Sequence, residues 1–459
     1  MKPIILFGAG VYAKKYKALL EYIDIDFDYF TDNDASKWGT SLYGKEIISP
    51  DELSKFHECQ IIISSTHEVA IREQLTKMGL GEHILGLDGL YRLCESKMEA
   101  VDGGQKEAHE EKTIIVDMYE GIGWGGTELW AANLAQGLSA LGRRTILLGG
   151  TEQLPLEKHY EKLVERVSDE DTIMHMVDLF EANLPCVFIN NFAGCAFMAA
   201  IIIKRKYPDM IKIISVIHND NKSLFDAHMM LKEYIDKVFC VSNEICGRML
   251  RIYDYDKDRY FFKEQPIAVD DQWVRKVNKI LPLRIGYAGR LVKQQKRTDK
   301  LVDFLECLEK LSFDYICQIA GEGECEAFIK EYVTEKHLEG KIQMHGRLPK
   351  SKMPEFWKAQ DVFINISEYE GTSLSMLEAM AYGCVPVVTD VSGAKEFIVD
   401  GDNGYICKVG NLKEMANRVK ELADNREKLE NASRRCRDII KQRCNPTEYM
   451  KYWIQELID

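Results

Sequence analysis

The sequence predicts an α/β protein built from parallel sheets with crossover helices. Short apolar runs rich in Val and Ile alternate with amphipathic segments of helix length along almost the whole chain, a pattern typical of strand–helix–strand units. Several of these runs end in glycine turns that open a helix, as parallel-sheet domains do where they bind ligands. With 459 residues the chain is too long for one ordinary core, so we expect several domains.

The expected strands are the apolar runs bounded by turn residues. They are Ile4–Phe7, Gln60–Ser64, Thr113–Asp117, Thr145–Leu148, Cys186–Asn190, Lys212–Ile217, Lys237–Val241, Leu283–Ala288, Tyr315–Ala320, Asp361–Ile366 and Val385–Thr389.

Two interruptions divide this pattern. Residues 96–112 are polar and charged and contain paired glycines, which is typical of a linker. A second boundary lies near Pro266, which interrupts the alternation of strands and helices. The expected domains are 1–95, 113–270 and 271–440, followed by an amphipathic segment, 441–459.

Charge and cysteine usage exclude some classes of protein. The net charge of −13 excludes a nucleic-acid binder that relies on overall positive charge. The thirteen cysteines include no CxxC pair, which favours reduced thiols in a cytoplasmic protein. The N-terminus enters a strand at once, which is not the pattern of a signal peptide.

One apolar run leaves two interpretations open. Residues 192–203 are apolar and are followed by Lys204, Arg205 and Lys206, but the run falls short of the roughly 20 residues that span a bilayer. It is either a buried helix of an α/β domain or a surface helix that contacts an anionic membrane. The second interpretation would place the protein peripherally at the inner face of the plasma membrane.

The first domain contains a candidate nucleotide site. Gly8 and Gly10 follow a strand and open a helix, and Asp32 comes about twenty residues later. Such glycines allow a pyrophosphate to approach the backbone, and the acid can bind ribose hydroxyls. Similar turns also occur where no ligand binds. The block resembles the small N-terminal domain of bacterial sugar O-acyltransferases in its FGAG, FTDND and WGTSLYGKEIISPDEL stretches, which implies either a retained sugar-nucleotide site or a structural role.

The second domain offers a glycine turn and a histidine. Gly125 and Gly126 precede a helix, where they form either an anion-binding turn or a simple tight turn. His218 ends a strand, and strand ends in parallel sheets face the ligand.

The third domain carries the clearest chemistry. Gly289 and Arg290 end a strand, with Lys293 and Lys296 close behind. A guanidinium fork and an ammonium are the two standard groups that hold phosphate oxygens. Arg347 and Leu348 follow a further short strand.

The strongest pattern is Glu370 followed by a helix that carries Glu378. Gly371 lets a ligand approach the backbone, and the amides of Thr372, Ser373 and Leu374 are expected to be free helix donors for an anion. Glu378 lies roughly 10 Å further along the helix at about 1.5 Å per residue, a span that suits one extended nucleotide-sugar. Two glutamates that merely favour the helix N-terminus are the alternative.

Taken in order, these stretches resemble glycosyltransferase family 4. The shared text is GRL with a following Lys, GEGE, HGRLP, EGTSLSMLEAMAYGCVPVVTD and GAKE, with GGTE, IHND and VSNEI earlier in the chain. The resemblance implies the GT-B fold of two Rossmann-like lobes, with residues 113–270 as acceptor lobe, 271–440 as donor lobe and 441–459 as a crossing helix. Residues 1–95 are an additional small Rossmann-like domain outside it.

The resemblance also implies a mechanism. Family members transfer a sugar from a nucleotide-diphosphate donor with retention of configuration, usually without a metal. Arg290 and Lys296 would neutralise the leaving diphosphate, while His218 and Glu370 would contact the sugar and Glu378 the ribose. The donor site would be lined by Gly125, Gly126, Gly289, Gly371, Thr372, Ser373, Leu374, Arg347 and Leu348. The loop before Lys296 is one residue longer than the plainest family pattern, so Lys293 is a second candidate.

The resemblance names no acceptor, which is a glycan, a lipid-linked sugar or a protein, and UDP is the expected carrier. No cofactor is expected, because the DxD-like triplets, such as Asp254-Tyr-Asp256, lie apart from the donor motifs. The rival interpretations are a non-catalytic sugar-nucleotide-binding scaffold and a GT-B epimerase or phosphorylase. Bacterial surface polysaccharide or cell-wall glycopolymer synthesis is the expected pathway.

Overall fold

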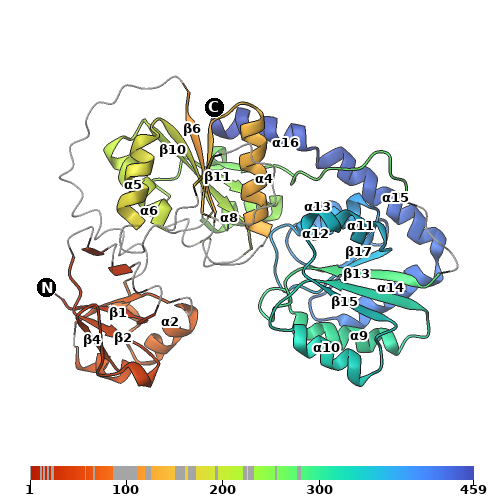
Figure 1. The fold of residues 1–459 in the computed structure, drawn as a ribbon, viewed down its shortest axis with the longest axis horizontal. Coiled ribbons are helices and arrows are strands. Elements are labelled where there is room, and N and C mark those ends of the chain that lie inside the picture. Colours follow the sequence, from red (N-terminus) through yellow and green to blue (C-terminus); the bar gives the residue numbers. More distant parts are fainter. Residues whose placement is uncertain are drawn as a thin grey trace. The chain divides into compact units, whose positions relative to one another are not determined.

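The computed structural model describes residues 2–10, 13, 16–17, 20–21, 25–56, 58–65, 68–85, 111–118, 126–149, 161–163, 172–191, 195–220, 225, 232–253, 256–275 and 281–459. These residues form three largely parallel sheets with helices between the strands (Figure 1), which confirms the predicted α/β class. The chain divides into two compact units, one of residues 1–121, 131–215 and 225–236 and one of 122–130, 216–224 and 237–459. Within the described residues, no helix is both long and apolar enough to span a bilayer.

The first sheet has five strands in the order β3-β4-β2-β1-β5. The strands are β1 Ile4–Phe7, β2 Tyr29–Thr31, β3 Ser41–Leu42, β4 Lys45–Ile48 and β5 Gln60–Ile63. Only the β3–β4 pair is antiparallel among the recorded pairs. Helix α2 (Glu68–Lys77) packs through Ile71 and Leu75 on a core that includes Phe7 and Ile61.

The second sheet has seven strands in the order β12-β11-β10-β9-β6-β7-β8. These are β6 Thr113–Asp117, β7 Thr145–Leu148, β8 Glu161–Leu163, β9 Cys186–Asn190, β10 Ile211–Ile217, β11 Lys237–Cys240 and β12 Tyr260–Phe262. The helices of this region are α4 Gly126–Ala140, α5 Thr172–Ala182, α6 Cys195–Lys206 and α8 Asn243–Tyr253. The strands β6, β9 and β10 are almost wholly buried, as expected for central parallel strands.

Helix α6 decides between the two interpretations of the apolar run before Lys204. Its apolar residues from Ala196 to Ile203 are all buried. Lys204 pairs with Asp236 at 2.5 Å, and Lys206 pairs with Glu181 at 3.0 Å. The segment is therefore a core helix, and the membrane-contacting surface helix was a wrong alternative, because the apolar face packs inside the protein.

The third sheet has six parallel strands in the order β15-β14-β13-β16-β17-β18. The strands are β13 Leu283–Ala288, β14 Tyr315–Ala320, β15 Ile342–Gly346, β16 Val362–Asn365, β17 Val385–Thr389 and β18 Tyr405–Cys407. The helices are α9 Leu301–Glu309, α10 Glu326–Glu335, α11 Met353–Lys358, α12 Leu374–Ala381, α13 Ala394–Phe397, α14 Leu412–Asp424, α15 Arg426–Arg443 and α16 Pro446–Tyr452.

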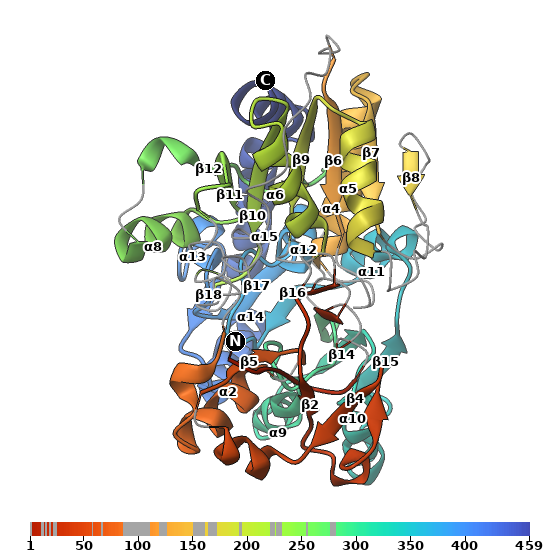
Figure 2. The same cartoon turned by 90° about the vertical axis from the view of Figure 1, so that its left-hand side faces the viewer.

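Helices cover both faces of this sheet. Figures 1 and 2 show α9 and α10 on one face and α11, α12 and α13 on the other. Alternate strand residues serve the two cores: Val362 and Ile364 pack with α9 and α10, whereas Phe363 packs with α11 and α12. The sheet is thus the buried middle layer of a doubly wound domain, and its strand ends form one shared edge.

The end of the chain packs by aromatic side chains. Helix α16 continues into a π-helical segment, Trp453–Ile458. The Trp130 indole of α4 donates to the Tyr449 hydroxyl at 2.9 Å, and the Trp453 ring centroid lies 4.7 Å from that of Phe239. These buried contacts anchor the C-terminal segment beside β11 and Trp130 of α4.

Candidate functional site

The candidate site is built on loops that follow the strands of the six-stranded sheet. Arg290 follows β13, Arg347 follows β15, and Glu370 follows β16. Because the strands are parallel, their carboxyl ends lie at the same edge. This edge therefore brings together basic side chains that can bind phosphate and an acidic side chain, which lie in separate sequence motifs.

Glu370 is the centre of a buried polar network. Its residue is only 5% exposed. Its Oε1 atom accepts from Lys296 Nζ at 2.5 Å, Ser367 Oγ at 2.6 Å and Asn365 Nδ2 at 3.4 Å. Gln295 Nε2 donates to the other oxygen, Oε2, at 3.3 Å. A buried carboxylate is stable only with such partners, and Lys296 supplies the compensating charge.

The structure brings Lys296, rather than Lys293, to Glu370. Lys293 is exposed; its backbone amide donates to Glu324 at 2.8 Å. The loop reaches this arrangement through two residues with left-handed backbone, Gln295 at φ 64° and Arg297 at φ 50°. Such conformations are unfavourable for residues with a Cβ and are concentrated at functional sites. The longer loop thus turns Lys296 inward.

Arg290 is exposed, and its guanidinium is held by a hydrogen bond to Gln295. Arg290 Nη2 donates to Gln295 Oε1 at 2.9 Å. Gln295 is a site residue that the sequence analysis missed, because a glutamine in a basic loop has no distinctive spacing. The only available signal was the extra residue in the loop between Arg290 and Lys296.

Gly371 allows His218 to lie against the turn after Glu370. A Cβ on Gly371 would lie 1.9 Å from the His218 carbonyl oxygen and 2.7 Å from Val241 Cγ2. The Asp220 amide also donates to the Glu370 carbonyl at 3.4 Å. His218 and Gly371 are 153 positions apart in the sequence. Their segments can meet only because residue 371 has no side chain.

His218 is half-buried beside an aromatic ring. The imidazole lies edge-on to the Trp130 indole, with ring centroids 4.9 Å apart. Asp220 pairs with Arg248 at 2.7 Å. Burial raises the pKa of the Asp220 carboxyl, and the Arg248 charge opposes that rise.

Helix α12 begins at Leu374, two residues after Thr372, where its free amides were expected to begin. Ser373 is the N-cap, and its Oγ accepts from the Met376 amide at 3.3 Å. The Thr372 hydroxyl donates to the Val241 carbonyl at 2.8 Å. Leu374 is the first helical residue, and its Cδ1 lies 3.8 Å from where a Cβ on Gly126 would be. Gly126 therefore lies next to the start of this helix.

Glu378 lies on α12, partly exposed at its surface. Burial raises the pKa of its carboxyl, and the charge of Lys350 and the Trp357 indole act in the opposite direction. A ligand that donates hydrogen bonds to the ionised Glu378 carboxylate would stabilise its charged form, which burial disfavours.

The remaining predicted residues of this domain lie at the same strand ends. A Cβ on Gly321 would lie 1.9 Å from the Gly289 carbonyl oxygen, so the turns after β13 and β14 pack closely. Arg347 is exposed and pairs with Glu322 at 3.3 Å, and Leu348 packs against the core under α11 and α12.

Gly8, Gly10 and Asp32 form a separate turn on the five-stranded sheet. Asp32 Oδ2 accepts from the Ala9 amide at 2.8 Å and from Lys37 Nζ at 3.0 Å. A Cβ on Gly8 would lie 2.7 Å from the Ser64 carbonyl oxygen. The predicted Gly125 lies outside the described residues.

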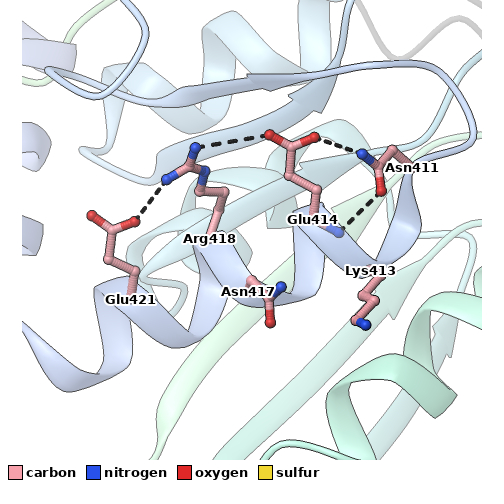
Figure 3. Close-up of a pocket in the computed structure, with 6 residues that line it drawn as sticks. All are labelled: Asn411, Lys413, Glu414, Asn417, Arg418 and Glu421. Atoms are coloured by element: carbon pink, nitrogen blue, oxygen red, sulfur yellow. Dashed lines mark hydrogen bonds and ion pairs between the residues drawn. The ribbon is translucent and has the colours of Figure 1, made fainter.

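A shallow depression of 360 Å³ lies elsewhere, on α14 and its N-cap (Figure 3). Three of its charged groups pair with one another: Arg418 pairs with Glu421 at 3.1 Å and with Glu414 at 3.8 Å. Asn411 donates to Glu414 at 2.7 Å. This is an exposed helix face with internally paired charges, and none of the predicted site residues lines it.

Comparison with known proteins shows which families and structures the chain resembles. Residues 271–438 match the family model described as glycosyl transferases group 1, and residues 1–85 match the model described as C2185-like, N-terminal. The Anabaena HepE structure with UDP and glucose aligns with a TM-score of 0.62, 16% identity, 76% of this chain and 99% of that chain. The lipopolysaccharide outer core galactosyltransferase WaaB aligns with a TM-score of 0.59, 16% identity, 75% of this chain and 99% of that chain.

The curated relatives are transferases or synthases of sugar conjugates. N-acetyl-alpha-D-glucosaminyl L-malate synthase of Bacillus anthracis is 23% identical over 54% of this chain and 67% of its own length. Poly(ribitol-phosphate) alpha-N-acetylglucosaminyltransferase of Staphylococcus aureus is 27% identical over 37% of this chain and 34% of its own length. The mannosyltransferase LpsB of Rhizobium meliloti is 32% identical over 32% of this chain and 44% of its own length.

The structural matches show the GT-B fold, and residues 271–438 are similar to the glycosyl transferases group 1 domain. The chain spans less than half the length of two of the three relatives just described.

Proposed function

We propose that the chain is a retaining, metal-independent glycosyltransferase of family 4 that uses a nucleotide-diphosphate-sugar. The observation that carries this proposal is the buried Glu370 carboxylate held by Lys296, with Arg290 linked to the same network through Gln295. One buried acid and two phosphate-type cations at one sheet edge suit a donor with sugar hydroxyls on one side and a diphosphate on the other.

The two cations would act on the leaving group. As the bond between the anomeric carbon and the diphosphate breaks, negative charge grows on the diphosphate, and Arg290 and Lys296 would stabilise it. This is electrostatic preorganisation, which acts more strongly on the transition state than on the bound donor. For Lys296 to do so, its pair with Glu370 must be shared with the phosphate.

The other residues would hold the donor. Glu370 would accept from sugar hydroxyls, His218 would contact the same sugar, and Glu378 would accept from the ribose. The nucleotide and diphosphate would be lined by Gly125, Gly126, Gly289, Arg347, Leu348 and the turn of residues 371–374. Residues 113–270 would bind the acceptor, 271–440 the donor, and 441–459 would join the two.

Relatives suggest the donor and acceptor classes. The Anabaena HepE structure is a complex with UDP and glucose, and two of the relatives are named for N-acetylglucosaminyl groups. We therefore propose a UDP-sugar donor, with a glycan, lipid-linked or protein acceptor in a bacterial surface polysaccharide or cell-wall glycopolymer pathway. The reaction would occur in the cytoplasm, at the inner face of the plasma membrane if the acceptor is lipid-linked.

The N-terminal domain is a separate proposal. Its turn at Gly8 and Gly10 would be a second sugar-nucleotide site of the kind its acyltransferase resemblance implies. Asp32 would have to release the Ala9 amide or Lys37 before it could bind a ribose.

The test is transfer by the purified full chain from a panel of nucleotide-sugars in EDTA. We expect nucleoside diphosphate release that depends on acceptor, and a product whose anomeric configuration by NMR matches that of the donor. Complete loss in EDTA that magnesium or manganese restores would refute metal independence. An inverted product would refute retention.

The same assay addresses the rivals. A scaffold would bind a nucleotide-sugar but transfer nothing. An epimerase would release an epimerised sugar, and a phosphorylase would release a sugar phosphate. Any of these outcomes would exclude transfer as the function.

A further inference from the structure

Gln295 links the cation and the acid of the candidate site. Its Oε1 accepts from Arg290 Nη2 at 2.9 Å, and its Nε2 donates to Glu370 Oε2 at 3.3 Å and to Asn219 Oδ1 at 3.4 Å. The amide thus uses its carbonyl and both N–H groups. Its orientation is settled by chemistry, because a guanidinium only donates and a carboxylate only accepts.

The backbone of Gln295 is fixed as well. Its carbonyl accepts from the Glu368 amide at 2.8 Å, on the segment that leads to Glu370. Arg297 Nη1 also pairs with Glu368 at 3.0 Å. These contacts hold the left-handed conformations at 295 and 297, so the loop and the Glu370 turn are bonded through main chain and side chains together.

A neutral amide meets the requirements of this position. It must face a guanidinium with an acceptor and a carboxylate with a donor at the same time. A carboxylate would repel Glu370, and an ammonium would repel Arg290. An apolar side chain of the same length would leave Arg290 free to rotate.

We propose that Gln295 is a positioning residue, which fixes the Arg290 guanidinium relative to Glu370 so that its other N–H groups face the donor diphosphate. This inference rests on the proposed function. Gln295 acts through Arg290 and Glu370 rather than on the reacting atoms. Because the ordering of the arginine then precedes donor binding, the cost of immobilising it is lowered.

The test compares phosphate-dependent with phosphate-independent binding. Gln295→Met keeps the length and removes the hydrogen bonds, whereas Gln295→Asn keeps an amide, tolerates the left-handed backbone and is too short to span both partners. The matched control is Gln294→Met, the same change at the exposed neighbouring glutamine. Calorimetry measures affinity and stoichiometry for whichever of UDP, GDP, ADP or TDP binds the wild type, and for the corresponding nucleoside.

We expect both Gln295 variants to bind the nucleoside diphosphate about tenfold more weakly, the effect of one side chain that must now be immobilised. Nucleoside affinity and stoichiometry should not change, and kcat for transfer should fall while KM for the acceptor stays the same. Gln294→Met should match the wild type in every measurement.

Three outcomes would overturn the inference. Equal loss of nucleoside and nucleoside diphosphate affinity, or reduced stoichiometry, would indicate a merely structural role. Wild-type affinity and kcat in both Gln295 variants would show that Arg290 needs no positioning. If the wild type binds none of the four nucleoside diphosphates, the proposed function fails and this inference fails with it.

Discussion

Two glycine turns in this chain look alike in sequence and differ in structure. One follows β1 at Gly8, with Asp32 nearby, and the other follows β16 at Gly371, beside Glu370. In both, a carboxylate pairs with a lysine, Lys37 for Asp32 and Lys296 for Glu370. Each turn also needs its glycine, because a Cβ would meet a carbonyl oxygen of a distant segment.

The two turns differ in the groups that donate hydrogen bonds to their acids. Asp32 accepts from the main-chain amides of Ala9 and Asp34, and Ala9 belongs to the glycine turn itself. A phosphate would compete with this acid for the same amide. Glu370 is held instead by side chains, those of Lys296, Ser367 and Gln295. Side chains can rotate toward a ligand, so the second turn is the better donor site.

The largest expected difference is in catalysis. Glu370→Gln should lower kcat/KM for transfer by about 10²–10³-fold, as loss of one preorganised polar group at a reacting centre does. Asp32→Asn should leave transfer unchanged, because its partners lie within its own turn. Initial rates of nucleoside diphosphate release measure both. Equal losses would mean that the first turn takes part in the reaction.

The second difference is in packing. Gly371→Ala should lower the free energy of unfolding by about 1–3 kcal/mol, as overpacking does, and should abolish transfer because the His218 segment must move. Gly8→Ala should cost a similar free energy in the first sheet and leave transfer intact. Urea unfolding and transfer assays measure the pair. Gly340→Ala, where a Cβ meets nothing within 4 Å, is the control and should match the wild type.

The third difference is in the response to acid. Burial tends to raise the pKa of Asp32, but hydrogen bonds from the Asp34 amide, Lys37 and the Ala9 amide outweigh it, and the pKa is lowered. The stabilisation is therefore present above the unfolded value, about 3.9, and is lost as the pH falls through the folded value.

The protection factors of the β1 and β2 amides, measured by hydrogen exchange and corrected for the pH dependence of the intrinsic exchange rate, should accordingly fall on acidification below about pH 4. Asp32→Asn should already be less protected at neutral pH, by about 1 kcal/mol for the lost charged hydrogen bonds, and should depend less on pH. The same acid response in the variant would contradict the role of Asp32.

The smallest expected effect is the stability cost of a left-handed residue that lies outside the candidate site. His337 has φ 54° in the exposed turn after α10. His337→Gly should raise the free energy of unfolding by about 0.5 kcal/mol, since glycine adopts this conformation without a Cβ penalty. His337→Ala retains the penalty and should give no gain. If neither variant changes stability, the positive φ at Gln295 and Arg297 carries little cost either.

The long buried strands were predictable and the short edge strands were not. Runs such as Cys186–Asn190 and Leu283–Ala288 are mostly apolar because both faces of these strands are covered. The strands β3, β8, β12 and β18 have two or three residues each, which is too few for any periodicity to appear. They form because a neighbouring strand offers hydrogen bonds.

The sequence by itself determined the parallel sheets, the order of the motifs, and the placing of Glu370, Arg290 and His218 at strand ends. Apolar runs, glycines and turn residues are local properties of the chain, and local properties suffice for these. Only the tertiary structure decided that Lys296 reaches Glu370, that Gln295 joins it to Arg290, and that Asp32 is bound by its own turn. The Lys296–Glu370 contact closes across 74 positions, and no local pattern records which side chains packing will bring together.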